Sequence, residues 1–198
     1  MSNIYYLMGK SSSGKDTIYK RIKELHPELK TVTIYTTRPI REGEKNGKEY
    51  YFVNEEKLQQ LLDDGKVIEL RTYDTIHGPG NYFTVDDGQF DQDTADYLMI
   101  GTLESYQKMR EYFGEERIVP LYIEVEDGER LMRALTRERM QKEPKYAEMC
   151  RRFLADTEDF SEENLKAVGI TERFENRELE ETVRKISERI QQKTGELG

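Results

Sequence analysis

The chain begins with a short apolar segment, a glycine-rich loop and an amphipathic helix, and this succession restricts the fold more than any other feature. Residues 4–8 (Ile-Tyr-Tyr-Leu-Met) have the length and apolar character of a buried strand. Gly9, Gly14 and Lys15 have the G-x-x-x-x-G-K spacing of a phosphate-binding loop. Its glycines let backbone N–H groups approach a phosphate, and its lysine adds positive charge. The succession therefore predicts a phosphate site where the helix over residues 16–25 begins.

The candidate phosphate ligands are the loop residues and the residues that open the helix: Gly9, Ser11, Ser12, Ser13, Gly14, Lys15, Asp16 and Thr17. In this motif the residue after the lysine is usually Ser or Thr, which holds magnesium. Here Asp16 follows the lysine and Thr17 comes one place later. Thr17 is thus the candidate Mg²⁺ ligand, and the role of Asp16 stays open. The alternative interpretation is a Ser/Gly turn that only caps the helix.

Strand-like and helix-like segments alternate along most of the chain. Strands are predicted over 31–35, 50–53, 67–73, 82–85, 97–100, 118–125 and 173–174, and helices over 54–65, 103–112, 128–140, 146–160 and 177–193. This alternation predicts one α/β domain over residues 1–198, with a parallel sheet covered by helices on both faces. Residues 36–86 break the alternation and predict a small inserted subdomain, with a turn at Gly78-Pro79-Gly80.

A second candidate anion site lies in the polar segment 36–53. Arg38 and Arg41 are three residues apart, and Tyr50 follows them. Each guanidinium can make two parallel hydrogen bonds to phosphate oxygens, and a phenol can add another donor. The alternative interpretation is a charged loop exposed to solvent.

The pattern T-T-R-x-x-R-x-G-E-x-x-G-x-x-Y-x-F-V over these residues, after a phosphate-binding loop, resembles the guanylate kinase family. Weaker resemblance continues to residues 151–152 and so covers most of the chain. It implies a P-loop α/β fold, an acceptor-binding subdomain over 36–86 and a helical lid over 137–150. It also implies ATP-dependent phosphorylation of GMP with Mg²⁺, by direct transfer.

The resemblance assigns roles by matched position. Arg38, Arg41 and Tyr50 would bind the GMP phosphate. Glu69 would accept hydrogen bonds from the guanine edge, and Tyr82 and Thr84 would make the remaining contacts to the acceptor. Lys15 would hold the outer phosphates of ATP, Arg137 and Arg152 the transferring phosphoryl group, and Asn176 would lie near adenine. Lys15, Arg38, Arg41, Arg137 and Arg152 would together form the catalytic electrostatic clamp. The structural alternatives are a solvent-facing Glu69, a salt-bridged helix surface for Arg137 and Arg152, and a helix N-cap for Asn176.

The chain departs from the family pattern around the base. Ile34 stands where many guanylate kinases carry a guanine-contacting serine, and residues 97–101, ending at Gly101, occupy the strand that usually carries an aspartate pair. A second hypothesis is therefore a kinase of the same fold acting on another phosphorylated acceptor, such as a ribose bisphosphate or another nucleotide. A third is a non-catalytic protein-binding module, which would have no need of Lys15.

Composition excludes several other classes. The formal net charge is −9, from 40 acidic and 31 basic residues, which argues against a nucleic-acid scaffold. The apolar runs are too short to span a membrane, and the first residues lack the pattern of a signal peptide. Cys150 is the only cysteine, so no intramolecular disulfide and no typical zinc site is expected. We expect a cytoplasmic protein with small-molecule nucleotide substrates and no nucleic-acid or membrane partner; the oligomeric state does not follow from the sequence.

Overall fold

A parallel sheet forms the centre of the molecule. A computed structural model describes residues 2–75, 78–91 and 95–195. The core sheet has the strand order β6-β1-β7-β8, and each neighbouring pair is parallel. The strands are β1 (Ile4–Gly9), β6 (Tyr97–Gly101), β7 (Ile118–Glu124) and β8 (Phe174–Glu175). This arrangement confirms the predicted parallel sheet.

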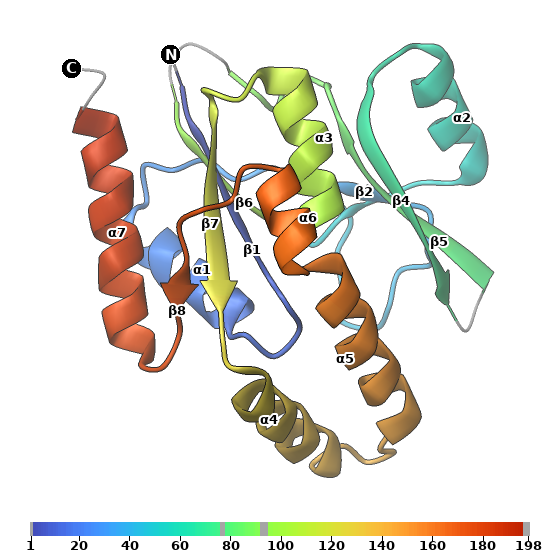
Figure 1. The fold of residues 1–198 in the computed structure, drawn as a ribbon. Coiled ribbons are helices and arrows are strands. Elements are labelled where there is room, and N and C mark those ends of the chain that lie inside the picture. The colour runs from blue at the N-terminus through green and yellow to red at the C-terminus, as the bar shows by residue number, and fades with distance from the viewer. Residues whose placement is uncertain (1, 76–77, 92–94, 196–198) are drawn as a thin grey trace.

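Helices cover both faces of this sheet, which explains why β1 is apolar throughout. Tyr5 and Leu7 face α1 (Lys15–Leu25) and α7 (Leu179–Gly195), whereas Tyr6 and Met8 face α3 (Leu103–Phe113) and α6 (Glu162–Ala167). Figure 1 shows the two helix layers on opposite sides of the sheet. The phosphate loop leaves the carboxyl end of β1, the edge at which α/β proteins bind ligands.

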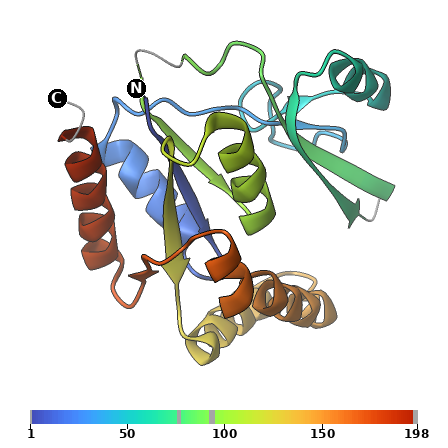
Figure 2. The ribbon, with the colours of Figure 1, turned by 45° about the horizontal axis from the view of Figure 1, so that its top comes forward.

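A second sheet, in the order β3-β2-β5-β4, stands to one side of the core sheet (Figure 2). It comprises β2 (Tyr35–Thr36), β3 (Tyr51–Phe52), β4 (Val67–Thr75) and β5 (Gly78–Val85), and α2 (Glu55–Asp63) packs against it. Leu58, Leu61, Phe83 and Val85 form its own small core. In the antiparallel β4–β5 pair, Glu69 lies opposite Thr84 and Arg71 opposite Tyr82.

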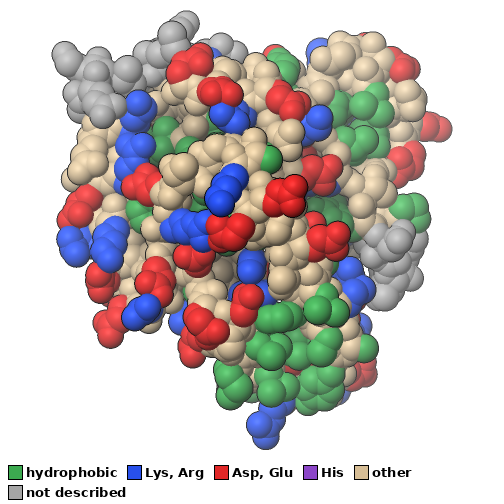
Figure 3. Space-filling model, in the orientation of Figure 1, with side chains coloured by type: hydrophobic (Ala, Val, Ile, Leu, Met, Phe, Trp, Pro, Cys, Tyr) green, Lys and Arg blue, Asp and Glu red, His purple; other side chains and the backbone are tan. Residues whose placement is uncertain are grey.

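Two further helices form a hairpin below the core sheet in Figure 1: α4 (Asp127–Arg139) and α5 (Tyr146–Asp159). Hydrophobic side chains gather on the surface at this end of the molecule (Figure 3). Met132 on α4 and Met140 just after it are 59% and 80% exposed. In the described part of the chain, no helix is both long enough and apolar enough to cross a bilayer.

Two local predictions were wrong, and one helix was missed. The predicted strand 31–35 pairs as a strand only at its last residue, because β2 comprises Tyr35 and Thr36. Residues 78–80 lie in β5 and not in a turn, and Pro79 pairs with Asp74. Proline fits there because β2 pairs with β5 only at Tyr82 and Phe83, so its missing N–H removes no pairing to β2. The short helix α6 was not predicted.

Candidate active site

The phosphate loop joins β1 to α1 with the backbone that its glycines permit. Gly14 has φ +86°, in the left-handed region that disfavours side chains. A Cβ on Gly9 would lie 2.6 Å from the carbonyl oxygen of Ile123, so a side chain cannot fit. Lys15 is the first residue of α1, which places its positive charge and the free N–H groups of the helix at the same point.

Two serine hydroxyls in this loop are buried and unpaired. The Oγ atoms of Ser12 and Ser13 have no hydrogen-bond partner within the described residues. A buried hydroxyl without a partner loses its hydration and gains nothing in return. A turn that only caps the helix does not require two such groups. The arrangement therefore favours a loop that binds an anion.

Asn176 connects this loop to α7 through hydrogen bonds. Its Nδ2 donates to the carbonyl oxygen of Ser13 at 2.8 Å, and a Cβ on Gly14 would lie 2.5 Å from the same Nδ2 atom. The Oδ1 atom accepts from the hydroxyl of Thr182 on α7 at 3.4 Å. The N-cap alternative for Asn176 is wrong, because α7 begins only at Leu179.

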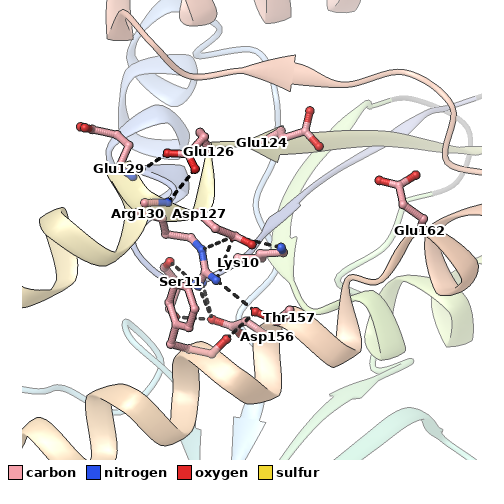
Figure 4. A network of polar contacts seen from close by, with 12 residues as sticks. Lys10, Ser11, Glu124, Glu126, Asp127, Glu129, Arg130, Asp156, Thr157 and Glu162 are labelled. Atoms are coloured by element: carbon pink, nitrogen blue, oxygen red, sulfur yellow. Dashed lines mark hydrogen bonds and ion pairs between the residues drawn. The ribbon is translucent and has the colours of Figure 1, made fainter.

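An ionic network around the buried Arg130 joins the other side of the loop to α4 and α5 (Figure 4). The Asp156 carboxylate accepts from the backbone N–H of Ser11 at 2.7 Å and also from the Ser11 hydroxyl. Arg130, 1% exposed, lies 3.5 Å from Asp156 and 3.1 Å from Asp127, and Asp127 also accepts from Lys10 at 3.2 Å. Burial opposes the charge of Asp127, but Lys10 and Arg130 hold its pKa below the ordinary value.

Arg137 and Arg152 come together at the mouth of the loop. Both line a cavity of about 140 Å³ that Ser11 and Ser12 also line. Arg152 donates to Glu148 at 2.8 Å, so it has the salt bridge of the alternative interpretation in this conformation. Arg151 and Arg152 lower the pKa of Glu148 to about 2. Arg137 is exposed and has no ion pair in the part of the chain that the structure describes.

The second sheet brings the predicted acceptor-phosphate residues together. Arg38, 6% exposed, donates through Nη1 and Nη2 to the two carboxylate oxygens of Glu44, at 2.8 and 2.6 Å. Its Nε donates to the Tyr82 hydroxyl at 3.1 Å, and its guanidinium lies 5.2 Å from the centre of the Tyr50 ring. The backbone N–H of Arg41 also donates to Glu44, at 2.8 Å, while the Arg41 side chain is exposed. Glu44 thus orients Arg38 with the bidentate geometry that a phosphate uses.

Glu69 is buried on the same sheet. It is 3% exposed, so the solvent-facing alternative is wrong. Its Oε2 accepts from Arg71 Nε at 2.8 Å, and its Oε1 accepts from Arg71 Nη2 at 3.2 Å and from the Thr84 hydroxyl at 2.7 Å. Thr84, 1% exposed, therefore contacts Glu69 and helps to orient it.

Comparison with known proteins identifies the family. The guanylate kinase family model matches residues 1–193. The chain belongs to the guanylate kinase family. The guanylate kinases of Nostoc sp. and Frankia casuarinae are 39% identical over 77 residues and 41% identical over 63 residues. These alignments cover 39% and 32% of this chain, and they span only 36% and 34% of the relatives' own lengths.

A solved guanylate kinase shares the fold. The crystal structure of guanylate kinase from Anaplasma phagocytophilum aligns with a TM-score of 0.64 at 23% identity. The alignment covers 96% of this chain and 85% of that one. It agrees with the α/β architecture described above.

Packing explains one departure from the guanylate kinase pattern. A Cβ on Gly101 would lie 2.2 Å from the Tyr6 hydroxyl and 2.6 Å from the Ser105 hydroxyl. These two hydroxyls are hydrogen-bonded to each other at 2.7 Å. The space that a side chain would need at this position is filled, so an aspartate does not fit there. Ile34 packs against the main hydrophobic core.

Several residues of the site were not found from the sequence. Arg71 could have been, because it lies two residues after Glu69 on one strand and hence on the same face. Glu44 belongs to the family pattern, but the pattern alone does not show that it pairs with Arg38. No local sequence pattern marks Arg130 and Asp156 as site residues, because only tertiary packing brings α4 and α5 against the phosphate loop.

The residues around the start of α1 fit a bound magnesium ion. Asp16 and Thr17 are exposed in its first turn and offer oxygen atoms, which Mg²⁺ prefers. Among the described residues, no group of three or more His, Cys, Asp or Glu side chains could hold a metal ion. Kinases usually hold Mg²⁺ through one or two protein ligands, water and substrate phosphates.

Proposed function

We propose that the protein transfers the γ-phosphoryl group of ATP to the phosphate of GMP and so forms ADP and GDP. Membership of the guanylate kinase family supports this reaction. The observation that carries it is the placement of the buried Glu69 carboxylate on the same sheet as the Arg38–Tyr82 pair, to which we assign the base and the phosphate of GMP respectively. Arg71 pairs with Tyr82 in the register and bonds to Glu69 through its side chain, so the two subsites adjoin.

The donor nucleotide would bind at the phosphate loop. Its phosphates would accept hydrogen bonds from the N–H groups at the start of α1 and from the hydroxyls of Ser12 and Ser13. They would also pair with the positive charge of Lys15. Its adenine would lie along α4, where Met132, Arg133 and Met140 line a hollow of about 610 Å³. Arg133 donates to the carbonyl oxygen of Asn176 at 3.2 Å, which joins this hollow to the loop.

Magnesium would be held by Asp16 and Thr17 together with the phosphates. When bound, it neutralises charge between the outer phosphates. The rest of the catalysis would come from positioning and from positive charge, and no general base is assigned. Lys15, Arg38, Arg41, Arg137 and Arg152 would form this clamp.

The lid over residues 137–150 and the acceptor subdomain over 36–86 would close on the two substrates. Closure excludes water and so limits the hydrolysis of ATP. Arg152 would exchange Glu148 for the transferring phosphoryl group, since both are anions and the salt bridge is exposed. We further propose that the protein acts in the cytoplasm on small nucleotides, without nucleic-acid or membrane partners.

The release of ADP from ATP tests the proposal when GMP, dGMP, AMP, UMP and ribose 1,5-bisphosphate are compared as acceptors. GMP and dGMP should give the highest kcat/KM. Preference for the ribose phosphate would establish the second hypothesis instead, a kinase of the same fold for another acceptor. The absence of turnover with every acceptor would favour a binding module without catalysis.

A further inference from the structure

The Glu69 carboxylate has little hydrogen-bonding capacity left for a base. A carboxylate offers about four lone-pair sites, two on each oxygen. Oε1 already accepts from Thr84 and from Arg71 Nη2, and Oε2 accepts from Arg71 Nε. One site on Oε2 remains. Glu69 can therefore accept one N–H from a base without losing an existing partner, whereas guanine offers adjacent donors at N1 and N2.

Arg71 has the opposite character, because it keeps donors to spare. A guanidinium carries five N–H groups, and Arg71 uses two of them, both on Glu69. Its Nη1 makes no hydrogen bond to any residue that the structure describes. The side chain is 9% exposed, and Nη1 is not among the fully buried atoms that lack a partner, so a ligand can reach it. Burial opposes its charge, but the Glu69 carboxylate more than compensates and raises the pKa of Arg71.

The pair thus presents one acceptor site next to free donors. We propose that Glu69 and Arg71 together read the lactam edge of a 6-oxopurine, with Glu69 accepting from N1–H and Arg71 donating to the O6 carbonyl. This inference rests on the proposed function and specifies how its acceptor is chosen. Arg71 becomes a specificity-determining residue, and the 2-amino group of guanine contributes little.

Two consequences for substrate choice follow. IMP has the same N1–H and O6 as GMP, so its kcat/KM should be less than about tenfold lower. AMP reverses the pattern, since it has an acceptor at N1 and a donor at C6. Both Glu69 and Arg71 would be mismatched, and AMP should be at least about 1,000-fold poorer than GMP.

The substitution Arg71→Met tests the inference. It removes the O6 donor and also frees two acceptor sites of Glu69, which can then accept from N2–H₂ of guanine. We expect kcat/KM to fall about 10- to 100-fold for IMP, less for GMP and hardly at all for AMP. The GMP-to-IMP ratio should therefore rise. Arg71→Lys keeps the charge but loses the planar guanidinium group. Its kcat/KM for IMP and its GMP-to-IMP ratio should lie between those of the wild type and of Arg71→Met.

Thr84→Val gives an independent test with a side chain of nearly the same shape. It removes one partner of Glu69, frees one site on Oε1 and leaves Arg71 in place. We therefore expect kcat/KM to fall less for GMP than for IMP, so that the GMP-to-IMP ratio again rises. Arg117→Met is the matched control for loss of a buried arginine, because Arg117 is 9% exposed and bonds to Ser2 beside the core sheet. It should lower thermal stability and leave all nucleotide ratios unchanged.

Equal losses for GMP, IMP and AMP in Arg71→Met would overturn the inference and place Arg71 on the acceptor phosphate. A wild type that discriminates strongly between GMP and IMP would overturn it as well. The dissociation constants of the three nucleotides, measured by calorimetry without ATP, separate this inference from the proposed function. Selective binding of GMP and IMP without turnover would refute only the kinase reaction, and binding without base preference would refute the role of the Glu69–Arg71 pair.

Discussion

The Asp156 carboxylate on α5 accepts a hydrogen bond of 2.7 Å from the backbone N–H of Ser11 in the phosphate loop. This contact ties the helical hairpin α4–α5 to the loop at a point where a backbone N–H would otherwise be free to bind an anion. Arg130 lies beneath it, 1% exposed, and depends on Asp156 and Asp127 for its compensating charge. The hairpin and the loop should therefore respond together to substitutions in either of them.

The first prediction concerns this dependence. Asp127→Ala and Asp156→Ala each leave Arg130 one carboxylate, so each should lower the free energy of unfolding by about 1 to 2 kcal/mol. The double substitution leaves a buried arginine without a counter-charge and should cost more than the sum, about 5 kcal/mol in all. Urea denaturation of the four proteins measures the coupling. Strictly additive losses would show that the two carboxylates do not share Arg130.

The second prediction concerns the phosphate loop. Lys15→Ala should lower kcat by on the order of 100-fold or more, because it removes a charge from the negative transition state. The fold should persist, since Lys15 lies in a loop–helix junction at the surface and not in the core. Lys20 is an exposed lysine on the same helix, so Lys20→Ala is the matched control and should leave kcat nearly unchanged. Near-normal turnover in Lys15→Ala would show that this loop does not bind ATP.

The third prediction concerns Arg41. Arg41→Met should raise KM for GMP and lower kcat, and leave KM for ATP almost unchanged, because the Arg41 side chain would contact only the acceptor phosphate. Arg184→Met on α7 removes an exposed arginine far along the chain and serves as the control. Steady-state kinetics with each substrate varied in turn gives the four constants. Equal weakening of ATP and GMP would place Arg41 outside the acceptor site.

The fourth prediction follows from Glu44. Arg38 first, and then the backbone N–H of Arg41, lower the pKa of Glu44 from 4.5 to about 2. A carboxyl group whose pKa is lower in the folded state stabilises the fold above its unfolded pKa, and this contribution is lost on acidification. Wild-type stability should thus fall between about pH 4.5 and pH 2 more steeply than that of Glu44→Gln. Parallel curves of thermal midpoint against pH for the two proteins would contradict the Arg38–Glu44 pair.

Local sequence signals located the parts of the fold that depend on local chemistry. The apolar run 4–8, the glycines of the phosphate loop and the periodicity of residues 16–25 predicted β1, its loop and α1. A strand buried on both faces leaves a short continuous apolar run, and an amphipathic helix leaves a period of about 3.6 residues. The acceptor motif likewise grouped Arg38 and Arg41 with Tyr50, and the resemblance added Tyr82 as a further acceptor contact. In the structure Arg38, Tyr50 and Tyr82 lie together, whereas the Arg41 side chain is exposed.

The remaining features depend on contacts between segments far apart in the chain. No local pattern shows that Asp156 reaches Ser11, or that Tyr6 and Ser105 fill the space beside Gly101. The strand at 78–80 was missed because glycine and proline usually mark turns, whereas here pairing with β4 overrides that preference.

The fate of the γ-phosphoryl group of ATP tests the central claim most directly. ATP labelled with ³²P at the γ-position is incubated with the protein, Mg²⁺ and GMP, and the products are separated by chromatography. The label should appear in the β-phosphate of GDP, in amounts equal to the ADP formed, and Lys15→Ala should abolish its transfer. Label found only as inorganic phosphate, or no GDP at all while ATP is consumed, would contradict direct transfer from ATP to GMP.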